Sequence, residues 1–170
     1  MTGTQVAETA PYPAAVIRRI RPTDMAVLSE FFAGLSMQSR YQRFFAPVTP
    51  GPNLLRVLAG CGGGTVDAVI AVTDGGIVGH AMAADRATPR GGQTSDIGVV
   101  VADAWQGRGV GTALMRVLIG GARARGVTSL TMDVLPDNHQ VLAMITGHWP
   151  AARIGRAQAR DTVCFTLPPR

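Results

Sequence analysis

Three glycines fall within five positions in residues 104–114, AWQGRGVGTAL. They follow an apolar run that predicts a strand over 96–101, and they precede a helical pattern that begins at Val110. At a helix N-terminus the free backbone N–H groups and the positive end of the dipole attract a phosphate, and glycine lets that phosphate come close. The alternative is a glycine-rich turn that binds nothing. The position between a strand and a helix favours a phosphate-binding loop.

Three phosphate-binding patterns can be compared with this stretch. A P-loop requires Gly-Lys-Ser/Thr, and the sequence contains no lysine. The dinucleotide fingerprint G-x-G-x-x-G fails at its sixth position, which is Thr112 when Gly107 is the first. The pattern Q/R-x-x-G-x-G/A is filled completely by residues 106–111, QGRGVG.

Around this loop the sequence resembles a known family. Residues 96–127, DIGVVVADAWQGRGVGTALMRVLIGGARARGV, and VLPDN at 134–138 resemble the acyl-CoA-binding core of the GCN5-related N-acetyltransferases, the GNAT superfamily. The front end, IRPTDMAVLSEFFAGLSMQSRYQRFF at 20–45, is similar to the acetyltransferase domain of bacterial Pat-type protein lysine acetyltransferases.

The resemblance implies that acetyl-CoA, or another short acyl-CoA, is the co-substrate and that no metal takes part. The pantetheine arm is expected along an open edge of the strand at 99–101, and the pyrophosphate at 106–112. Asn138 has two interpretations, a contact to the co-substrate arm or a helix cap. The residues expected to bind the co-substrate are Val99, Val100, Val101, Gln106, Gly107, Arg108, Gly109, Val110, Gly111, Thr112 and Asn138.

Acyl transfer to an amine requires a neutral amine, and a primary amine with a pKa of about 10 arrives protonated. In the family a glutamate frequently stands at the start of the strand that binds the co-substrate, and Asp96 occupies that place here. We therefore expect Asp96 to be the catalytic base, directly or through water. The alternative is a strand-entry residue that satisfies a turn.

The leaving thiolate has no evident proton donor in the sequence. Many relatives carry a tyrosine on the helix after Asn138, whereas Tyr12 and Tyr41 fall in other segments. Water can serve instead, because a thiolate with a pKa of about 8.5 is a tolerable leaving group. The oxyanion is expected to be stabilised by a backbone N–H among residues 99–101.

Histidines and cysteines add little to this chemistry. His80, His139 and His148 lack metal-ligand spacing and are expected to be structural, with His139 the one to test because it follows Asn138. Cys164 lies in an apolar run and is expected to be a buried small hydrophobe.

The elements that must position these residues form an α/β pattern. We expect a single GNAT-like domain over 14–170, with a mixed, mostly antiparallel twisted sheet flanked by helices and a central β-α-β unit, after a flexible tail at 1–13. A hairpin is predicted around Asp74-Gly75-Gly76, and a loop at 86–93. Strands are expected at 14–21, 65–73, 77–85, 96–101, 129–134, 152–157 and 161–167, and helices from Pro22 to about 35 and at 36–45, 54–58, 110–125 and 136–146.

Composition and charge limit the classes of binding partner that are expected. All sixteen basic residues are arginines, the net charge is +5, and the arginines are scattered, so nucleic acid is not expected. No signal peptide or membrane span is evident, and we expect a cytoplasmic protein. The acceptor is a primary amine of a protein lysine or of a small molecule, and a homodimer is an open alternative. A non-catalytic acyl-CoA sensor is the other functional class, kept open by the missing tyrosine and by the aspartate in place of glutamate.

Overall fold

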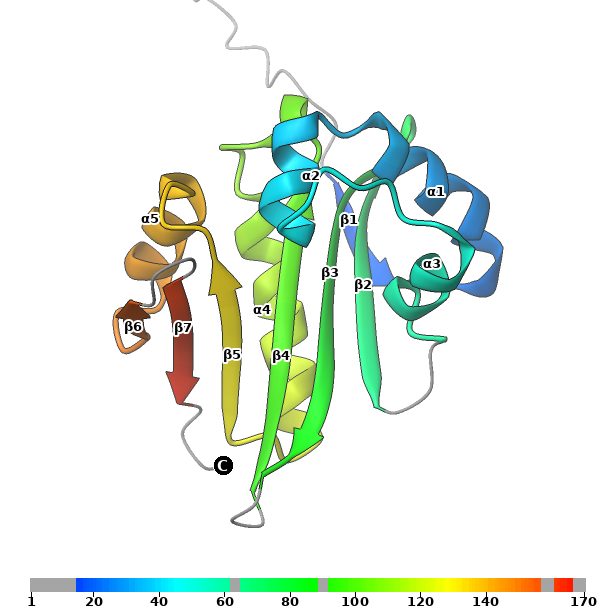
Figure 1. Ribbon diagram of the computed structural model, residues 1–170. Helices are drawn as coiled ribbons and strands as arrows, with labels where there is room; N and C mark the ends of the chain where they lie inside the picture. Colours follow the sequence, from blue (N-terminus) through cyan, green and yellow to red (C-terminus); the bar gives the residue numbers. More distant parts are fainter. Residues whose placement is uncertain (1–14, 62–64, 89–91, 157–160, 167–170) are drawn as a thin grey trace, which may run out of the picture.

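The computed structural model describes residues 15–61, 65–88, 92–156 and 161–166, which are built around one seven-stranded sheet (Figure 1). The strand order is β1-β2-β3-β4-β5-β7-β6, and each neighbouring pair is antiparallel except β4 and β5. The strands are β1 (Val16–Arg19), β2 (Val66–Thr73), β3 (Gly76–Ala87), β4 (Gln93–Val101), β5 (Ser129–Val134), β6 (Arg153–Arg156) and β7 (Asp161–Thr166). This confirms the expected mixed, mostly antiparallel sheet.

Helices cover both faces of this sheet. On one face α1, α2 and α3 lie over β2, β3 and β4, and on the other α4 runs behind the same strands, with α5 beside it (Figure 1). The bounds are α1 (Met25–Gly34), α2 (Met37–Phe44), α3 (Pro52–Leu58), α4 (Val110–Ala124) and α5 (His139–His148), with 3-10 turns at Pro22–Asp24 and Asp103–Trp105. Within the described residues, no helix is long and apolar enough to cross a membrane.

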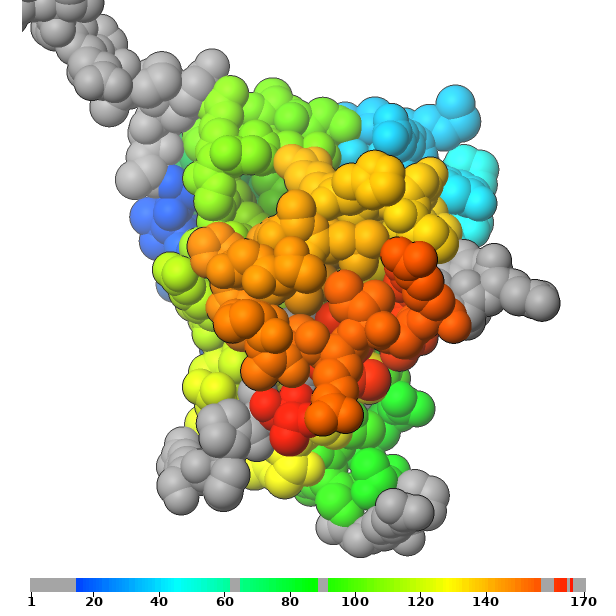
Figure 2. Space-filling model, turned by 90° about the vertical axis from the view of Figure 1, so that its left-hand side faces the viewer, coloured from blue at the N-terminus to red at the C-terminus, as the bar shows by residue number. Residues whose placement is uncertain are grey.

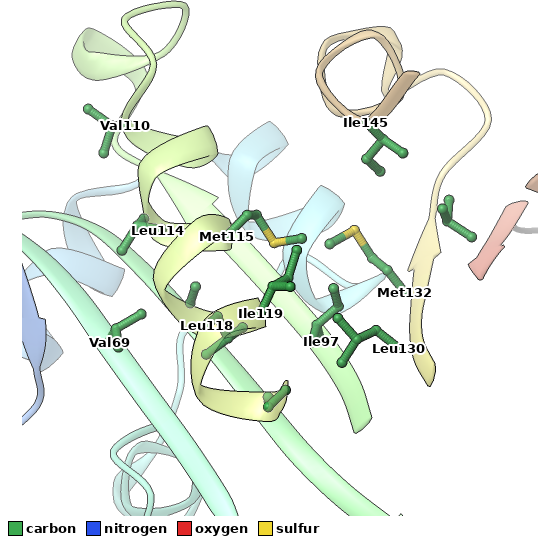
Figure 3. Close-up of a cluster of buried hydrophobic side chains, with 14 of the residues drawn as sticks. Val69, Ile97, Val110, Leu114, Met115, Leu118, Ile119, Leu130, Met132 and Ile145 are labelled. Carbon is green, nitrogen blue, oxygen red and sulfur yellow. The ribbon is translucent and has the colours of Figure 1, made fainter. Parts of the chain in front are cut away.

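The larger of two apolar cores lies between α4 and the sheet. The α4 residues at helical spacing, Leu114, Leu118 and Ala122, are fully buried. Met115 of α4 and Met132 of β5 point toward each other (Figure 3), and Ile145 of α5 belongs to the same cluster. Because β4, α4 and β5 share this core, the loop that opens α4 is fixed relative to the sheet.

The β4–β5 pair is the feature that makes room for a site. The two strands are paired only at Thr94–Asp96, opposite Ser129–Thr131. Beyond Asp96, β4 continues along β3 up to Val101, whereas β5 continues along β7. Residues 97–101 therefore present a strand edge that β5 does not cover, which confirms the predicted β-α-β unit and the open strand edge expected at 99–101.

Two local expectations need correction. The loop predicted at 86–93 is shorter at both ends, because β3 extends to Ala87 and β4 begins at Gln93, with Arg86 opposite Thr94. Polar residues can extend an antiparallel ladder wherever a partner strand supplies the hydrogen bonds. Cys164 is exposed, not buried, because alternate β7 residues face opposite sides and its neighbour Val163 occupies the core. The expected tail at 1–13 lies outside the described residues.

Two glycine-to-alanine substitutions, one in β3 and one in α4, test how tightly α4 packs on the sheet. A Cβ at Gly79 of β3 would lie 2.9 Å from Leu114 Cδ1 and 3.2 Å from Val110 Cγ1, whereas one at Gly120 of α4 would meet nothing within 4 Å. We expect Gly79→Ala to lower the free energy of unfolding by about 1–3 kcal/mol through overpacking. Gly120→Ala should raise it by about 0.5–1 kcal/mol through helix propensity. Urea unfolding measures both, and equal effects would contradict the packing.

Candidate active site

A pocket of about 320 Å³ opens where β4 leaves β5. It gathers segments that are far apart in the sequence: the end of β4, the glycine loop, the start of α5 and one side of α2. In Figure 2, α5 (orange) lies between the start of α4 (light green) and β6 and β7. Of the predicted residues, those that line it are Val99, Val100, Val101, Gln106, Gly107, Gly109, Gly111, Thr112 and Asn138.

The other two predicted residues of the loop lie elsewhere. Val110 is buried beneath the loop and packs in the apolar core. The guanidinium carbon of Arg108 lies 5.5 Å from the centre of the Trp105 ring, and the Arg108 side chain is not part of the pocket wall. The structure thus brings nine of the eleven predicted residues to one wall.

The glycine loop has a backbone that needs glycine. Gly107 and Gly109 have φ values of 71° and 80°, in the left-handed region that other residues rarely adopt. A Cβ at either position would meet nothing within 4 Å, so the space in front of the loop is open. The first hydrogen bond within α4 runs from the Ala113 N–H to the Gly109 carbonyl, at 3.0 Å. The N–H groups of residues 110–112 therefore lie in the unpaired first turn, where an anion is favoured.

A polar network fixes α2 against the end of β4. Asp103 accepts hydrogen bonds from the Ser36 N–H (3.1 Å), the Ser36 hydroxyl (2.7 Å) and the Ser39 hydroxyl (2.9 Å). The Gln106 side-chain amide donates to Ser39 Oγ (3.1 Å) and to the Val101 carbonyl (3.0 Å). Gln106 therefore joins α2 to the strand with its side chain. Burial raises the pKa of Asp103, but the hydrogen bonds from Ser36 and Ser39 outweigh it and lower the pKa overall.

This docking places Arg43 of α2 flat on β4. A Cβ built on Gly98 would lie 2.6 Å from Arg43 Cζ and 2.8 Å from each terminal guanidinium nitrogen. Only glycine at position 98 leaves room for the guanidinium. Burial lowers the pKa of Arg43 to about 10, so the group stays charged at neutral pH. It lines the first pocket and also a second one of about 450 Å³.

Asp96 lies at the last β4 position paired to β5 and lines the second pocket. Its carboxylate is bound by Arg86, with Nε at 2.7 Å from one oxygen and Nη2 at 2.7 Å from the other. The Thr131 hydroxyl of β5 donates to the same carboxylate. Both side chains of the ion pair are about half exposed, so another cation can reach the carboxylate from solvent.

Asn138 is the N-cap of α5, since its Oδ1 accepts from the Val141 N–H at 3.3 Å. It is also buried and lines both pockets, so the two alternatives for this residue, cap and pocket contact, do not exclude each other.

Sequence reasoning missed several wall residues. The helical period after Asn138 brings Val141, Met144 and His148 to the face of α5 that lines the first pocket. His139, the histidine singled out from the sequence, is exposed and lines neither pocket. Their positions, three, six and ten residues after Asn138, follow the helical period and were the signal that could have found them.

The remaining histidine, His80, has the expected structural role. It is fully buried, its Nε2–H donates to the Leu58 carbonyl at 2.8 Å, and its ring packs edge-on against Phe32. Burial, reinforced by the charge of Arg43, lowers its pKa to about 3, so it is neutral. Within the described ranges no cluster of three histidine, cysteine or acidic residues could hold a metal ion.

Comparison with known proteins agrees with this geometry. The profile of the Acetyltransferase (GNAT) family matches residues 36–146. The GNAT domain of S. lividans PAT superimposes with a TM-score of 0.80 at 24% identity, covering 90% of each chain. A phosphinothricin acetyltransferase from Sinorhizobium meliloti in complex with AcCoA has a TM-score of 0.70 at 16% identity, covering 91% of this chain and 89% of that one.

A ribosomal-protein-alanine N-acetyltransferase from Brucella melitensis shares the fold as well, with a TM-score of 0.66 at 19% identity, covering 89% of this chain and 99% of that one. Among curated proteins no sequence matches. The family profile and the α/β fold thus agree on an acyltransferase class. The chain belongs to the GNAT acetyltransferase family, whose members are acetyl-CoA-dependent enzymes.

The Asp103 network gives a test of how α2 is held. Replacing Asp103 with Asn removes the charge that accepts from three groups of α2, so the α2 amides should exchange hydrogen faster. Because the pKa of Asp103 is lowered in the folded state, its contribution to stability is present above the unfolded value of about 3.9 and is lost as the pH falls through the folded value. The difference in unfolding free energy between wild type and Asp103→Asn should therefore shrink below about pH 4. A difference that is the same at pH 3 and pH 7 would contradict the charged network.

Proposed function

We propose that this chain transfers the acetyl group of acetyl-CoA directly to a primary amine in the cleft beside β4. One observation carries the proposal: β4 leaves β5 after Asp96, and the opened edge, the glycine loop and Asn138 line one pocket. This arrangement offers backbone donors to a phosphate at one end and a strand edge to an amide-containing arm at the other.

The residues present fit such a ligand. The positive-φ glycines leave the front of the loop open, and a Cβ there would stand in the place of a pyrophosphate. Val99, Val100 and Val101 supply the edge for the pantetheine arm, and Asn138 closes the far side. Acetyl-CoA supplies the activated thioester carbonyl. One of the N–H groups of residues 99–101 stabilises the oxyanion that forms there.

Asp96 takes the proton from the incoming amine. The acceptor arrives as an ammonium ion and can replace Arg86 as the cationic partner of Asp96, which exchanges one exposed ion pair for another. Thr131 holds the carboxylate at the strand junction while the partner changes. Proton transfer to Asp96, directly or through a water molecule, then leaves the amine free to attack.

The leaving thiolate is protonated by water. Tyr41 is exposed on α2 and lines neither pocket, and Tyr12 lies outside the described residues. A thiolate with a pKa of about 8.5 leaves without a dedicated acid at neutral pH.

Two matched glycine substitutions test the co-substrate site. Gly109 and Gly126 stand at opposite ends of α4 with φ values of 80° and 83°, and a Cβ at either would meet nothing within 4 Å. Leucine is equally strained at both positions, but only Gly109 lines the pocket. We expect Gly109→Leu to weaken acetyl-CoA binding more than tenfold and Gly126→Leu to change it less than twofold, measured by calorimetry on folded protein. Equal affinities would overturn the assignment.

Asp96→Asn tests the base. The substitution keeps the size of the side chain and removes its basicity, so kcat/KM at pH 7 should fall by about 10²–10⁴ while acetyl-CoA affinity stays within a few-fold. Much of the loss should return at high pH, where the amine loses its proton unaided. Arg86→Gln, which leaves the carboxylate in place, should not reproduce the loss. Near-full activity of Asp96→Asn at pH 7 would remove Asp96 from the mechanism, and a loss equal at every pH would assign it to positioning.

A further inference from the structure

The guanidinium of Arg43 is a charge without a counter-ion in the described part of the chain. No carboxylate there lies within 4 Å of it, and its Nε is buried without a hydrogen-bond partner. Besides Gly98, the guanidinium contacts the ring of Phe44, whose centre lies 5.2 Å from Arg43 Cζ. A partly buried charge is costly unless it is paired, so this position calls for an anion.

The other charged groups of the second pocket indicate what kind of ligand would carry that anion. Asp96 lines the same pocket, but Arg86 holds both of its oxygens. Asp133 also lines the pocket, and it accepts from Thr162 at 3.0 Å. His80, which is buried near Arg43, is neutral. The pocket thus combines two cations and two carboxylates, a pattern that complements a ligand with one charge of each sign.

We propose that Arg43 binds the carboxylate of the acceptor, and that the acceptor is a small amino acid whose own amine is acetylated. This inference rests on the proposed function, because it names the acceptor of the same cleft.

The position of Arg43 sets the distance between carboxylate and amine. Asp96 and Gly98 are two residues apart on one face of β4, which corresponds to roughly 7 Å along the strand. The base and the guanidinium therefore border the same few ångströms of cleft, a span that suits an α-amino acid. The side chain of a protein lysine would bring four methylene groups to this place and no anion.

The stacking of Arg43 on Gly98 favours recognition of a planar anion. The flat face of the guanidinium rests on the strand, and its N–H groups lie around the edge of that plane. A carboxylate is bound by such a fork through two parallel hydrogen bonds, which a lysine at the same position cannot supply. Because Arg43 lines both pockets, the bound carboxylate would lie beside the opened edge of β4.

The test compares free amino acids with the corresponding amino acid amides as acceptors, by release of the CoA thiol. For wild type we expect kcat/KM to favour the free acid. In Arg43→Met the ratio of acid to amide should fall by about 10- to 100-fold, through KM for the acid, with acetyl-CoA affinity retained. Comparing this ratio between enzymes cancels the different amine pKa values of acids and amides. Arg43→Lys should restore only part of the preference.

Arg40→Met is the matched control, because Arg40 is on the same helix, donates to Thr49 at 2.9 Å and lines neither pocket. It should leave the ratio unchanged. Gly98→Ala displaces the guanidinium without altering its charge and should lower the ratio as Arg43→Met does. Thermal unfolding of each variant separates a loss of fold from a loss of the subsite.

The outcomes separate this inference from the proposed function. Equal use of acids and amides by wild type, a ratio that Arg43→Met does not change, or a higher kcat/KM for a lysine peptide than for any free amino acid overturns the inference and leaves acetyl transfer intact. If no amine releases CoA, the proposed function fails. Calorimetry of amino acids against CoA-loaded protein then decides the subsite: binding that Arg43→Met weakens tenfold supports it, and no binding overturns it.

Discussion

The backbone of β4 beyond Asp96 is the constraint on which the rest of the structure depends. Its residues are hydrogen-bonded to β3 on one side, and β5 has turned away toward β7 on the other. Unpaired backbone groups inside a protein need partners, and here the fold supplies only some of them, such as the Gln106 amide that donates to the Val101 carbonyl. The remaining edge is available to a ligand because the fold does not cover it.

Two different forces fix the elements beside this edge. Apolar burial holds α4: it packs its fully buried face on the sheet, so the N-terminal N–H groups of α4 stay beside Val101. Hydrogen bonds hold α2: Asp103, just after β4, accepts from Ser36 and Ser39 at the start of that helix. The first is non-directional and tolerates change of similar volume, whereas the second depends on geometry and on the charge of one aspartate. Gln106, which donates to Ser39 and to the Val101 carbonyl, links the two arrangements.

Local signals were sufficient to predict the glycine loop and the elements on either side of it. Glycines stand at the loop positions whose backbone has a positive φ. The strand at 129–134 and the helix from Val110 follow from periodicity alone. The loop predicted at 86–93 is shorter at both ends because strand pairing, which is non-local, extended the hairpin through polar residues. Arg43 and Asp103 are 60 positions apart in the sequence and neighbours through Ser39, and no periodicity of either segment predicts that contact. His148 lies beyond the helix predicted at 136–146, whereas α5 continues to His148.

Gly98 shows why the acceptor side is harder to predict than the co-substrate side. Within a strand, glycine weakens local propensity and by itself suggests a bulge or a close approach without saying of what. Here the approaching group is a guanidinium carried by a helix, and Arg43 and Gly98 line the same pocket. The family profile includes both positions, but a fold shared at 24% identity specifies the path of β4 and not the side chain that rests on it. In the acceptor site proposed above, the arginine is placed by a contact between two elements, and the contact requires the glycine on one of them as well as the arginine on the other.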